Sequence, residues 1–173
     1  IQGNVLEIGA GTGINFSLYP VGTHVIACEP SAAMLRYAHE RLDKEKSGIR
    51  TDIELVHAGT GDEELEAYVP AGGFDAIVCT LVLCTVSDLD KTLETIKKWL
   101  KPGGTLHILE HIQSEKPGKR FFQNFFNPLW RHLAEGCNLN RQTDEVLKDY
   151  GFQPVWEDYF VKGMPFYQAV LRR

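Results

Sequence analysis

Short apolar runs alternate with amphipathic segments along the first 110 residues of the chain. Five runs have the length and composition of buried strands, at residues 4–8, 24–28, 53–57, 74–79 and 105–110. Segments with helical spacing lie between them, at residues 12–19, 32–46, 62–68 and 88–100. Ser31 and either Ser87 or Asp88 are suitable N-caps, and Pro102 ends the last of these helices. This alternation predicts a parallel sheet covered by helices.

The pattern changes after residue 110. Residues 118–135 place aromatic and leucine side chains on a helical face, and Asn127–Pro128 predicts a break within it. A shorter helix is expected at 142–150, and strands at 153–160 and 167–171 form a hairpin through a turn at 162–165. The whole pattern predicts a doubly wound α/β fold with a mostly parallel sheet and a C-terminal antiparallel hairpin.

The turn after the first strand is crowded with glycine. Such a turn lets backbone N–H groups approach a ligand, and Glu29 at the tip of the second strand can accept both ribose hydroxyls of an adenosine cofactor. Dinucleotide enzymes favour G-x-G-x-x-G, whereas Gly9, Gly11 and Gly13 form G-x-G-x-G and Ile14 takes the place of the third dinucleotide glycine. The pattern therefore favours an adenosine cofactor that is not a dinucleotide. A glycine-rich turn that binds nothing is the alternative.

Charge is unevenly distributed along the chain. The net formal charge of -5 over 173 residues argues against a nucleic-acid-binding protein. Residues 111–141 nevertheless carry five basic and two acidic side chains, a local charge of +3 that leaves -8 for the remainder. A solvated helix face explains this segment most simply. The alternative is a basic, aromatic surface that makes peripheral contact with a membrane or binds an anionic substrate.

The cysteines show no spacing typical of a structural site. Cys28, Cys79, Cys84 and Cys137 include no C-x-x-C pair and no repeated His/Cys pattern. We therefore expect no metal site and no disulfide framework, but reduced thiols in a cytoplasmic or cytosol-facing protein. No apolar run reaches the roughly 18 residues of a membrane span. Because the chain does not begin with Met, we expect a fragment that lacks an N-terminal segment.

Most of the chain resembles the class I S-adenosylmethionine (SAM)-dependent methyltransferases. The stretches VLEIGAGTG at 5–13, EPSAAML at 29–35 and LKPGGTL at 100–106 carry this resemblance. More narrowly, three stretches are similar to the thiol S-methyltransferases, which are related to the ubiquinone/menaquinone-type enzymes: CTLVLCTV at 79–86, LKPGG...EH at 100–111 and the block at 121–141. The resemblance implies one Rossmann-like domain over residues 1–173. Its seven-stranded sheet would end with an antiparallel strand inserted beside the last parallel one.

The same resemblance implies SAM as the cofactor, with S-adenosylhomocysteine (SAH) as the product. Glu7 would organise the glycine loop around the methionine end, Glu29 would bind the ribose, and Pro30 and Met34 would cover the adenine. The Asp that usually meets the adenine amino group has no clear counterpart in residues 58–62, so Thr60 or a backbone group would replace it. The expected cofactor residues are Glu7, Gly9, Ala10, Gly11, Gly13, Glu29, Pro30, Met34, Thr60, Thr80 and Leu81.

The resemblance also implies a small, apolar acceptor, first of all a thiol. A quinone-ring carbon or a lipid head-group nitrogen is the alternative acceptor, and a SAM-binding protein without turnover is the alternative from another class. His111 is the candidate base or orienting group, with a hydrogen-bonded structural histidine as its alternative. A lid or substrate segment at about 113–141 would contribute the substrate residues Phe125, Trp130, Asn138 and Arg141. Family members are usually anchored to endoplasmic reticulum or lipid-droplet membranes, so a longer parent protein would be membrane-associated.

Overall fold

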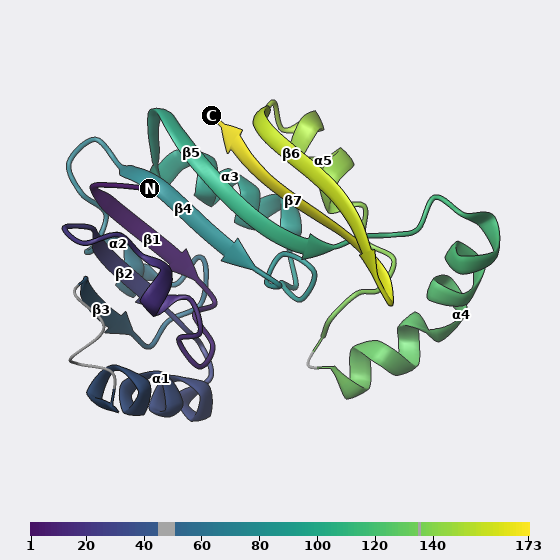
Figure 1. The fold of residues 1–173 in the computed structure, drawn as a ribbon, viewed down its shortest axis with the longest axis horizontal. Coiled ribbons are helices and arrows are strands. Elements are labelled where there is room, and N and C mark those ends of the chain that lie inside the picture. The colour runs from purple at the N-terminus through teal and green to yellow at the C-terminus, as the bar shows by residue number, and fades with distance from the viewer. Residues whose placement is uncertain (45–50, 135) are drawn as a thin grey trace.

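The computed structural model describes residues 1–44, 51–134 and 136–173. Within these residues, seven strands form one sheet in the order β3-β2-β1-β4-β5-β7-β6 (Figure 1). The strands are β1 (Asn4–Ile8), β2 (His24–Cys28), β3 (Asp52–Val56), β4 (Phe74–Thr80), β5 (Leu100–His111), β6 (Gln153–Lys162) and β7 (Met164–Arg172). The helices are η1 (Phe16–Leu18), α1 (Ala32–Lys44), α2 (Glu63–Glu66), α3 (Leu89–Trp99), α4 (Pro117–Leu133) and α5 (Thr143–Asp149).

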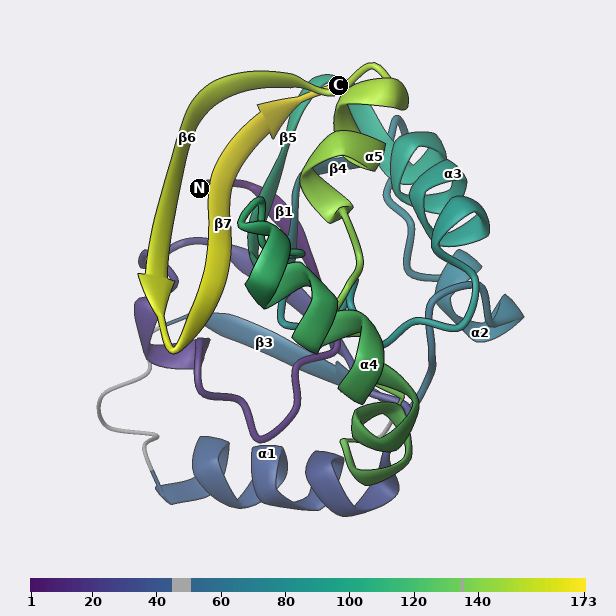
Figure 2. The ribbon, with the colours of Figure 1, turned by 90° about the vertical axis from the view of Figure 1, so that its right-hand side faces the viewer.

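The sheet has the predicted mixed topology. Strands β1 to β5 pair in parallel, whereas β7 runs antiparallel between β5 and β6. Figure 2 shows α2, α3 and α5 on the same side of the sheet, where Leu65, Trp99 and Leu147 join the larger core cluster. On the opposite face, Phe16 from η1 and Ala38 from α1 pack against β1 and β2 in a second cluster. The α/β fold with its C-terminal hairpin is therefore confirmed.

The helix predicted at 12–19 is largely absent. Residues 11–15 form turns, and only the single 3₁₀ turn η1 follows them. Gly11 and Gly13 have φ angles of 57° and 74°, which are incompatible with a right-handed helix. Pro20 then ends the segment. The prediction was wrong because the backbone conformation of the glycine loop overrode the local helical spacing.

Helix α4 also departs from the prediction, because it runs through Asn127 and Pro128 without a break. The Asn127 side chain does not turn back onto its own backbone; its Oδ1 accepts a hydrogen bond of 2.7 Å from the Leu139 backbone N–H. None of the residues of α4 is buried, and Figure 1 shows the helix standing away from the sheet.

Smaller differences concern the ends of elements. Helix α1 is described as far as Lys44, so the predicted residues 45 and 46 lie outside the described residues. Strand β5 begins at Leu100 and therefore includes the 101–104 turn that was expected to precede it. Asp88, and not Ser87, caps α3, with its side chain accepting from the Lys91 backbone N–H at 3.0 Å. In the part of the chain that the structure describes, no helix combines the length and apolar character that a membrane crossing requires.

Candidate active site

A cavity of about 730 Å³ opens at the carboxyl ends of β1, β2 and β4. Parallel α/β sheets bind ligands at this edge, where the order of strands reverses direction beside β1. The volume falls within the range of about 300–1,000 Å³ that is usual for small-molecule sites. Eight of the eleven expected cofactor residues line it: Gly9, Gly11, Glu29, Pro30, Met34, Thr60, Thr80 and Leu81. Among the described residues, Glu7, Ala10 and Gly13 are not part of this wall.

Glycine is required at the three positions of the loop for different structural reasons. All three adopt positive φ angles. A Cβ atom on Gly9 would collide with the Val82 side chain, and one on Gly13 would collide with the Phe16 ring, so both are needed for packing. A Cβ atom on Gly11 would meet no heavy atom within 4 Å, and Gly11 lines the cavity. Gly11 therefore leaves backbone exposed to a ligand, as a cofactor loop requires.

Glu29 joins the tip of β2 to the glycine loop. Its Oε2 accepts a hydrogen bond of 2.9 Å from the Gly11 N–H, and its Oε1 accepts one of 2.8 Å from the Ser31 N–H. The side chain is only 7% exposed but lines the cavity. Each carboxylate oxygen has a second lone pair, so the group retains the capacity to accept ligand hydroxyls.

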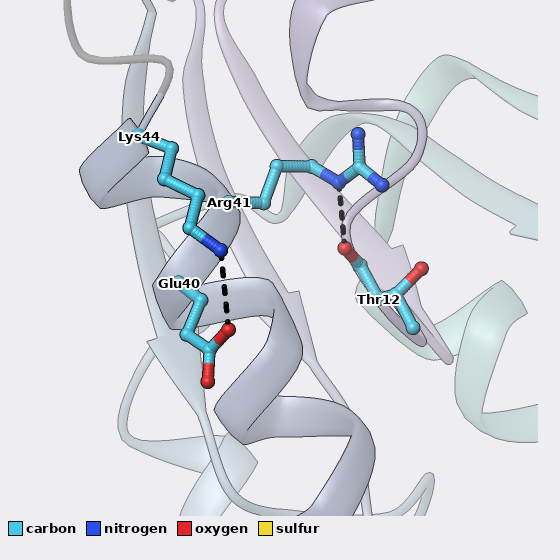
Figure 3. Close-up of polar contacts among 4 residues, drawn as sticks. All are labelled: Thr12, Glu40, Arg41 and Lys44. Carbon is cyan, nitrogen blue, oxygen red and sulfur yellow. Dashed lines mark hydrogen bonds and ion pairs between the residues drawn. The ribbon is translucent and has the colours of Figure 1, made fainter.

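A contact from α1 secures the loop from its outer side. The Arg41 Nε donates a hydrogen bond of 2.9 Å to the Thr12 carbonyl oxygen, as Figure 3 shows. The neighbouring pair of Lys44 and Glu40, with an N–O distance of 3.4 Å, is exposed and contributes little to stability. The sequence contains no signal that would have identified Arg41, because the contact joins residues 29 positions apart.

Glu7 is a buried carboxyl group that contacts the glycine loop through Asn15. It is 1% exposed, and its Oε1 accepts a hydrogen bond of 2.8 Å from the Asn15 side-chain amide, which also lies 3.1 Å from the Thr80 Oγ1. Burial raises the pKa of Glu7, while the hydrogen bond from Asn15 opposes this shift. The carboxyl group thus acts through Asn15, which connects the loop after β1 to the exit of β4. Asn15 was not identified from the sequence.

A strained turn follows β4 at the edge of the cavity. Among the described residues, Leu81 is the only non-glycine residue with a positive φ, 58°, and its N–H donates to the Leu109 carbonyl at 2.8 Å. The next two N–H groups, of Val82 and Leu83, each donate to the Glu110 Oε1 at 2.8 Å. A non-glycine residue in this conformation costs of the order of 1 kcal/mol and persists only where its surroundings hold it.

Glu110 is the buried carboxyl group that holds this turn. It is fully buried, and its Oε2 also accepts a hydrogen bond of 3.3 Å from the Cys84 N–H. Burial raises the pKa of Glu110 to about 7, although the backbone N–H bonds favour the charged form. From the sequence, this residue is only the last position of the strand predicted at 105–110, with no role assigned to it.

Two of the four expected substrate residues bind the same turn. Arg141 Nη1 donates hydrogen bonds to the carbonyl oxygens of Leu83 and Val86, the latter at 3.0 Å. The Asn138 side-chain amide donates to the Cys84 carbonyl oxygen at 2.9 Å. The structure therefore places Arg141 and Asn138 as groups that position residues 81–86, and neither lines the cavity.

The other two expected substrate residues lie on α4, outside the cavity wall. Phe125 is 68% exposed and Trp130 is 39% exposed. The expected lid segment thus presents its aromatic side chains to solvent in this structure, since none of the residues of α4 is buried.

His111 is the last residue of β5, and it does not line the cavity. It is 5% exposed, and its Nε2 lies 2.9 Å from the Cys137 Sγ. Burial lowers the pKa of His111, and the positive charge of Arg141 lowers it further. The ring is therefore neutral near pH 7 and is held against a thiol.

The family model and the similar proteins all point to methyltransferases. A family model described as a methyltransferase domain matches residues 2–157. The human thiol S-methyltransferase TMT1A is 32% identical over 150 residues, which are 86% of this chain and 59% of that protein. The chain thus spans well under two thirds of that relative's length. The ubiquinone/menaquinone biosynthesis C-methyltransferase UbiE of Escherichia coli is 29% identical, with coverage of 90% of this chain and 68% of that protein.

Solved structures show the same fold. A SAM-dependent methyltransferase from Methanosarcina mazei superposes with a TM-score of 0.71 at 15% identity, covering 98% of this chain and 92% of that one. Magnesium protoporphyrin IX methyltransferase from Synechocystis, solved with bound SAH, gives a TM-score of 0.67 at 13% identity, with coverages of 98% and 73%. At these identities the likeness concerns the arrangement of the chain alone.

Proposed function

This chain belongs to the methyltransferase-domain family, and from that premise we propose that it transfers a methyl group from SAM to the sulfur of a small, apolar thiol. One observation carries the cofactor assignment: Gly11 leaves open space in the cavity directly beside the Glu29 carboxylate. The acceptor assignment is supported by the similarity to the human thiol S-methyltransferase.

The residues of the cavity fit an adenosine cofactor. When bound, SAM supplies a methyl group on a sulfonium, which is a good leaving group. We propose that Glu29 accepts the ribose hydroxyls and that Pro30 and Met34 cover the adenine, near Thr60. Thr80 and the strained Leu81 would then line the methionine part at the exit of β4.

The protein's main catalytic tasks are alignment of the sulfur and exclusion of water. A thiolate is the nucleophile, and small thiols with a pKa near 8.5 provide some thiolate in solution. His111 is neutral but engaged by Cys137, away from the cavity wall. We therefore propose that His111 is a positioning residue for the 81–86 turn and not the base that abstracts the thiol proton.

Two other functions remain as alternatives. The similarity to UbiE favours methylation of a quinone-ring carbon as the second candidate reaction, with a lipid head-group nitrogen as a further acceptor. A SAM-binding protein without turnover is the candidate from a different class. Each predicts SAM binding in the same cavity, so the acceptor has to be tested separately from the cofactor.

The first experiment is calorimetric titration of SAM and SAH into the wild-type protein and Glu29→Ala, with NAD as a control ligand. We expect binding of both ligands, weakened about tenfold or more in the variant, because charge-assisted hydrogen bonds contribute about 1.5–3 kcal/mol. Glu54→Ala removes an exposed glutamate from the neighbouring strand β3 and should bind like the wild type. Equal SAM affinity in Glu29→Ala and wild type, with both folded by circular dichroism, would contradict the assignment.

The acceptor is tested by SAH release from a panel of alkyl thiols, quinols and lipid amines. We expect turnover with thiols at a kcat/KM that exceeds that for the other two classes. Faster turnover with a quinol would instead support methylation of a quinone-ring carbon. SAM binding without SAH release from any acceptor would favour the non-catalytic alternative.

A further inference from the structure

Three potential metal ligands converge behind the turn that follows β4. Cys84 lies in that turn, His111 ends β5, and Cys137 belongs to the segment after α4. The Cys137 Sγ lies 2.9 Å from the His111 Nε2 and 3.9 Å from the Cys84 Sγ. One ligand atom from each residue lies within 4.8 Å of the other two. No metal site was expected from the sequence, because it contains no C-x-x-C pair and no repeated His/Cys spacing.

We propose that Cys84, His111 and Cys137 bind a Zn²⁺ ion, with a fourth coordination position open to water or a small exogenous ligand. Two thiolates and an imidazole are a ligand set that zinc prefers, and sites with three protein ligands keep a fourth position for water or substrate. The site is separate from the proposed cofactor cavity, since none of the three residues lines that cavity.

Two of the three ligand separations can be compared directly with those of tetrahedral coordination. Zn–S bonds of about 2.3 Å at tetrahedral angles place two sulfur atoms about 3.8 Å apart, and a Zn–N bond of about 2.0 Å gives an N–S separation near 3.5 Å. The observed separation of the two sulfur atoms, 3.9 Å, already matches. The separation of 2.9 Å between His111 and Cys137 is a hydrogen bond, so metal binding requires these atoms to move apart by about half an ångström.

The polar groups around the cluster are consistent with a metal site. His111 is 5% exposed, and its Nδ1 is buried without a hydrogen-bond partner among the described residues. The Trp130 indole N–H donates to the Cys137 Sγ at 3.3 Å, the kind of contact that orients and stabilises a ligating thiolate. Two thiolates would neutralise the charge of one Zn²⁺ ion. The neighbouring charged groups are the Glu110 carboxyl and the Arg141 guanidinium, which have opposite signs.

Metal binding would link three segments that the hydrogen bonds already bring together. The turn that contains Cys84 also contributes Leu81, Val82 and Thr85 to the cavity wall. A bound ion would therefore fix one wall of the cavity from behind. The proposal itself does not depend on methyl transfer, because metal binding can be measured directly.

The test is titration of Zn²⁺ into the reduced, metal-free protein in competition with a chromophoric chelator. We expect one ion per chain, and affinity reduced about 100-fold or more in Cys84→Ser, Cys137→Ser and His111→Gln. Cys28→Ala and His107→Gln are the controls, since Cys28 lies in β2 and His107 lies on the same strand as His111. Both controls should retain wild-type affinity.

Two measurements on the wild type keep the proposal testable if a variant fails to fold. Zinc binding at pH 7 should release about two protons per ion, because both thiols become thiolates. Substitution by Co²⁺ should give the intense visible absorption of a tetrahedral site with sulfur ligands. Absence of stoichiometric binding to the reduced protein, or loss of affinity in Cys28→Ala instead of the cluster variants, would overturn the proposal.

Discussion

Single buried carboxyl groups hold the loops that form the candidate site. Glu7 acts through Asn15 on the glycine loop, Glu29 bonds to the loop directly, and Glu110 binds the N–H groups of the turn after β4. Burial raises the pKa of Glu7 and of Glu110, so the protonation state of these two groups is linked to folding. The linkage is largest where burial is complete, which is the case for Glu110.

We predict that Glu110→Gln removes a pH-dependent contribution to stability. The pKa of Glu110 is raised from 4.5 to about 7, so the folded chain binds this proton more tightly than the unfolded chain. Its contribution is therefore fully present below pH 4.5 and is lost as the pH rises through 7. Urea unfolding should show the wild-type free energy of unfolding falling, relative to that of the variant, by about 3 kcal/mol between pH 4.5 and pH 8.

Two histidines with lowered pKa values do not affect this comparison of wild type with Glu110→Gln. His107 and His111 have lowered pKa values, and their contributions are lost on acidification below about pH 6.5. These contributions occur in both proteins and cancel in the difference. Parallel stability profiles for wild type and Glu110→Gln would show that Glu110 is charged in the folded state throughout this range.

Among the elements, α4 is distinctive because none of its residues is buried. Phe121 and Phe125 stack at a centroid distance of 6.3 Å, yet they are 65% and 68% exposed. Lys119 and Arg120 lie on the same helix. Exposed aromatic residues beside basic ones favour the interface of an anionic membrane, whereas a lid over an apolar substrate would need to move onto the cavity.

We predict that the protein sediments with vesicles containing anionic lipid and that Phe121→Ser/Phe125→Ser weakens this binding about tenfold or more. Added salt should weaken it further, because the basic side chains are exposed. Val161→Ser, which removes a 68% exposed apolar side chain from β6, is the matched control. Absence of binding to any anionic vesicle, together with a raised KM for apolar thiols in the double variant, would favour the lid instead.

At the scale of the whole molecule, the C-terminal hairpin completes the sheet and the core. Strand β7 pairs with β5 along residues 105–111 and with β6 on its other side. Tyr167 and Leu171 are fully buried within the larger core cluster. The hairpin therefore stabilises β5, which carries the Glu110 that holds the turn beside the candidate site.

We predict that Leu171→Ala lowers the free energy of unfolding by about 2–5 kcal/mol, which is a large part of the 5–15 kcal/mol of a typical domain. Leu18→Ala should change it by less than about 0.5 kcal/mol, because that side chain is 75% exposed. Chemical denaturation followed by circular dichroism measures both. A loss of less than about 1 kcal/mol at Leu171 would mean that the hairpin is not an integral part of the core.

The features that depend on neighbouring residues could be predicted from the sequence. The strand runs, the glycine turn with Glu29, and the C-terminal hairpin all follow from local spacing, because backbone geometry sets which nearby residues share a face or form a turn. The same local reasoning failed at 12–19 and at Asn127–Pro128. In both places a conformation or a side-chain contact from outside the helical pattern prevailed.

Contacts between residues distant in the sequence became known from the folded chain alone. Glu110 reaches the N–H groups of residues 82–84, and Arg141 reaches carbonyl oxygens 58 and 55 positions earlier. The cluster of Cys84, His111 and Cys137 has no sequence signature, because it arises where the exit of β4, the end of β5 and the segment after α4 come together. Such contacts depend on strand order and chain crossing, which no local pattern of residues encodes.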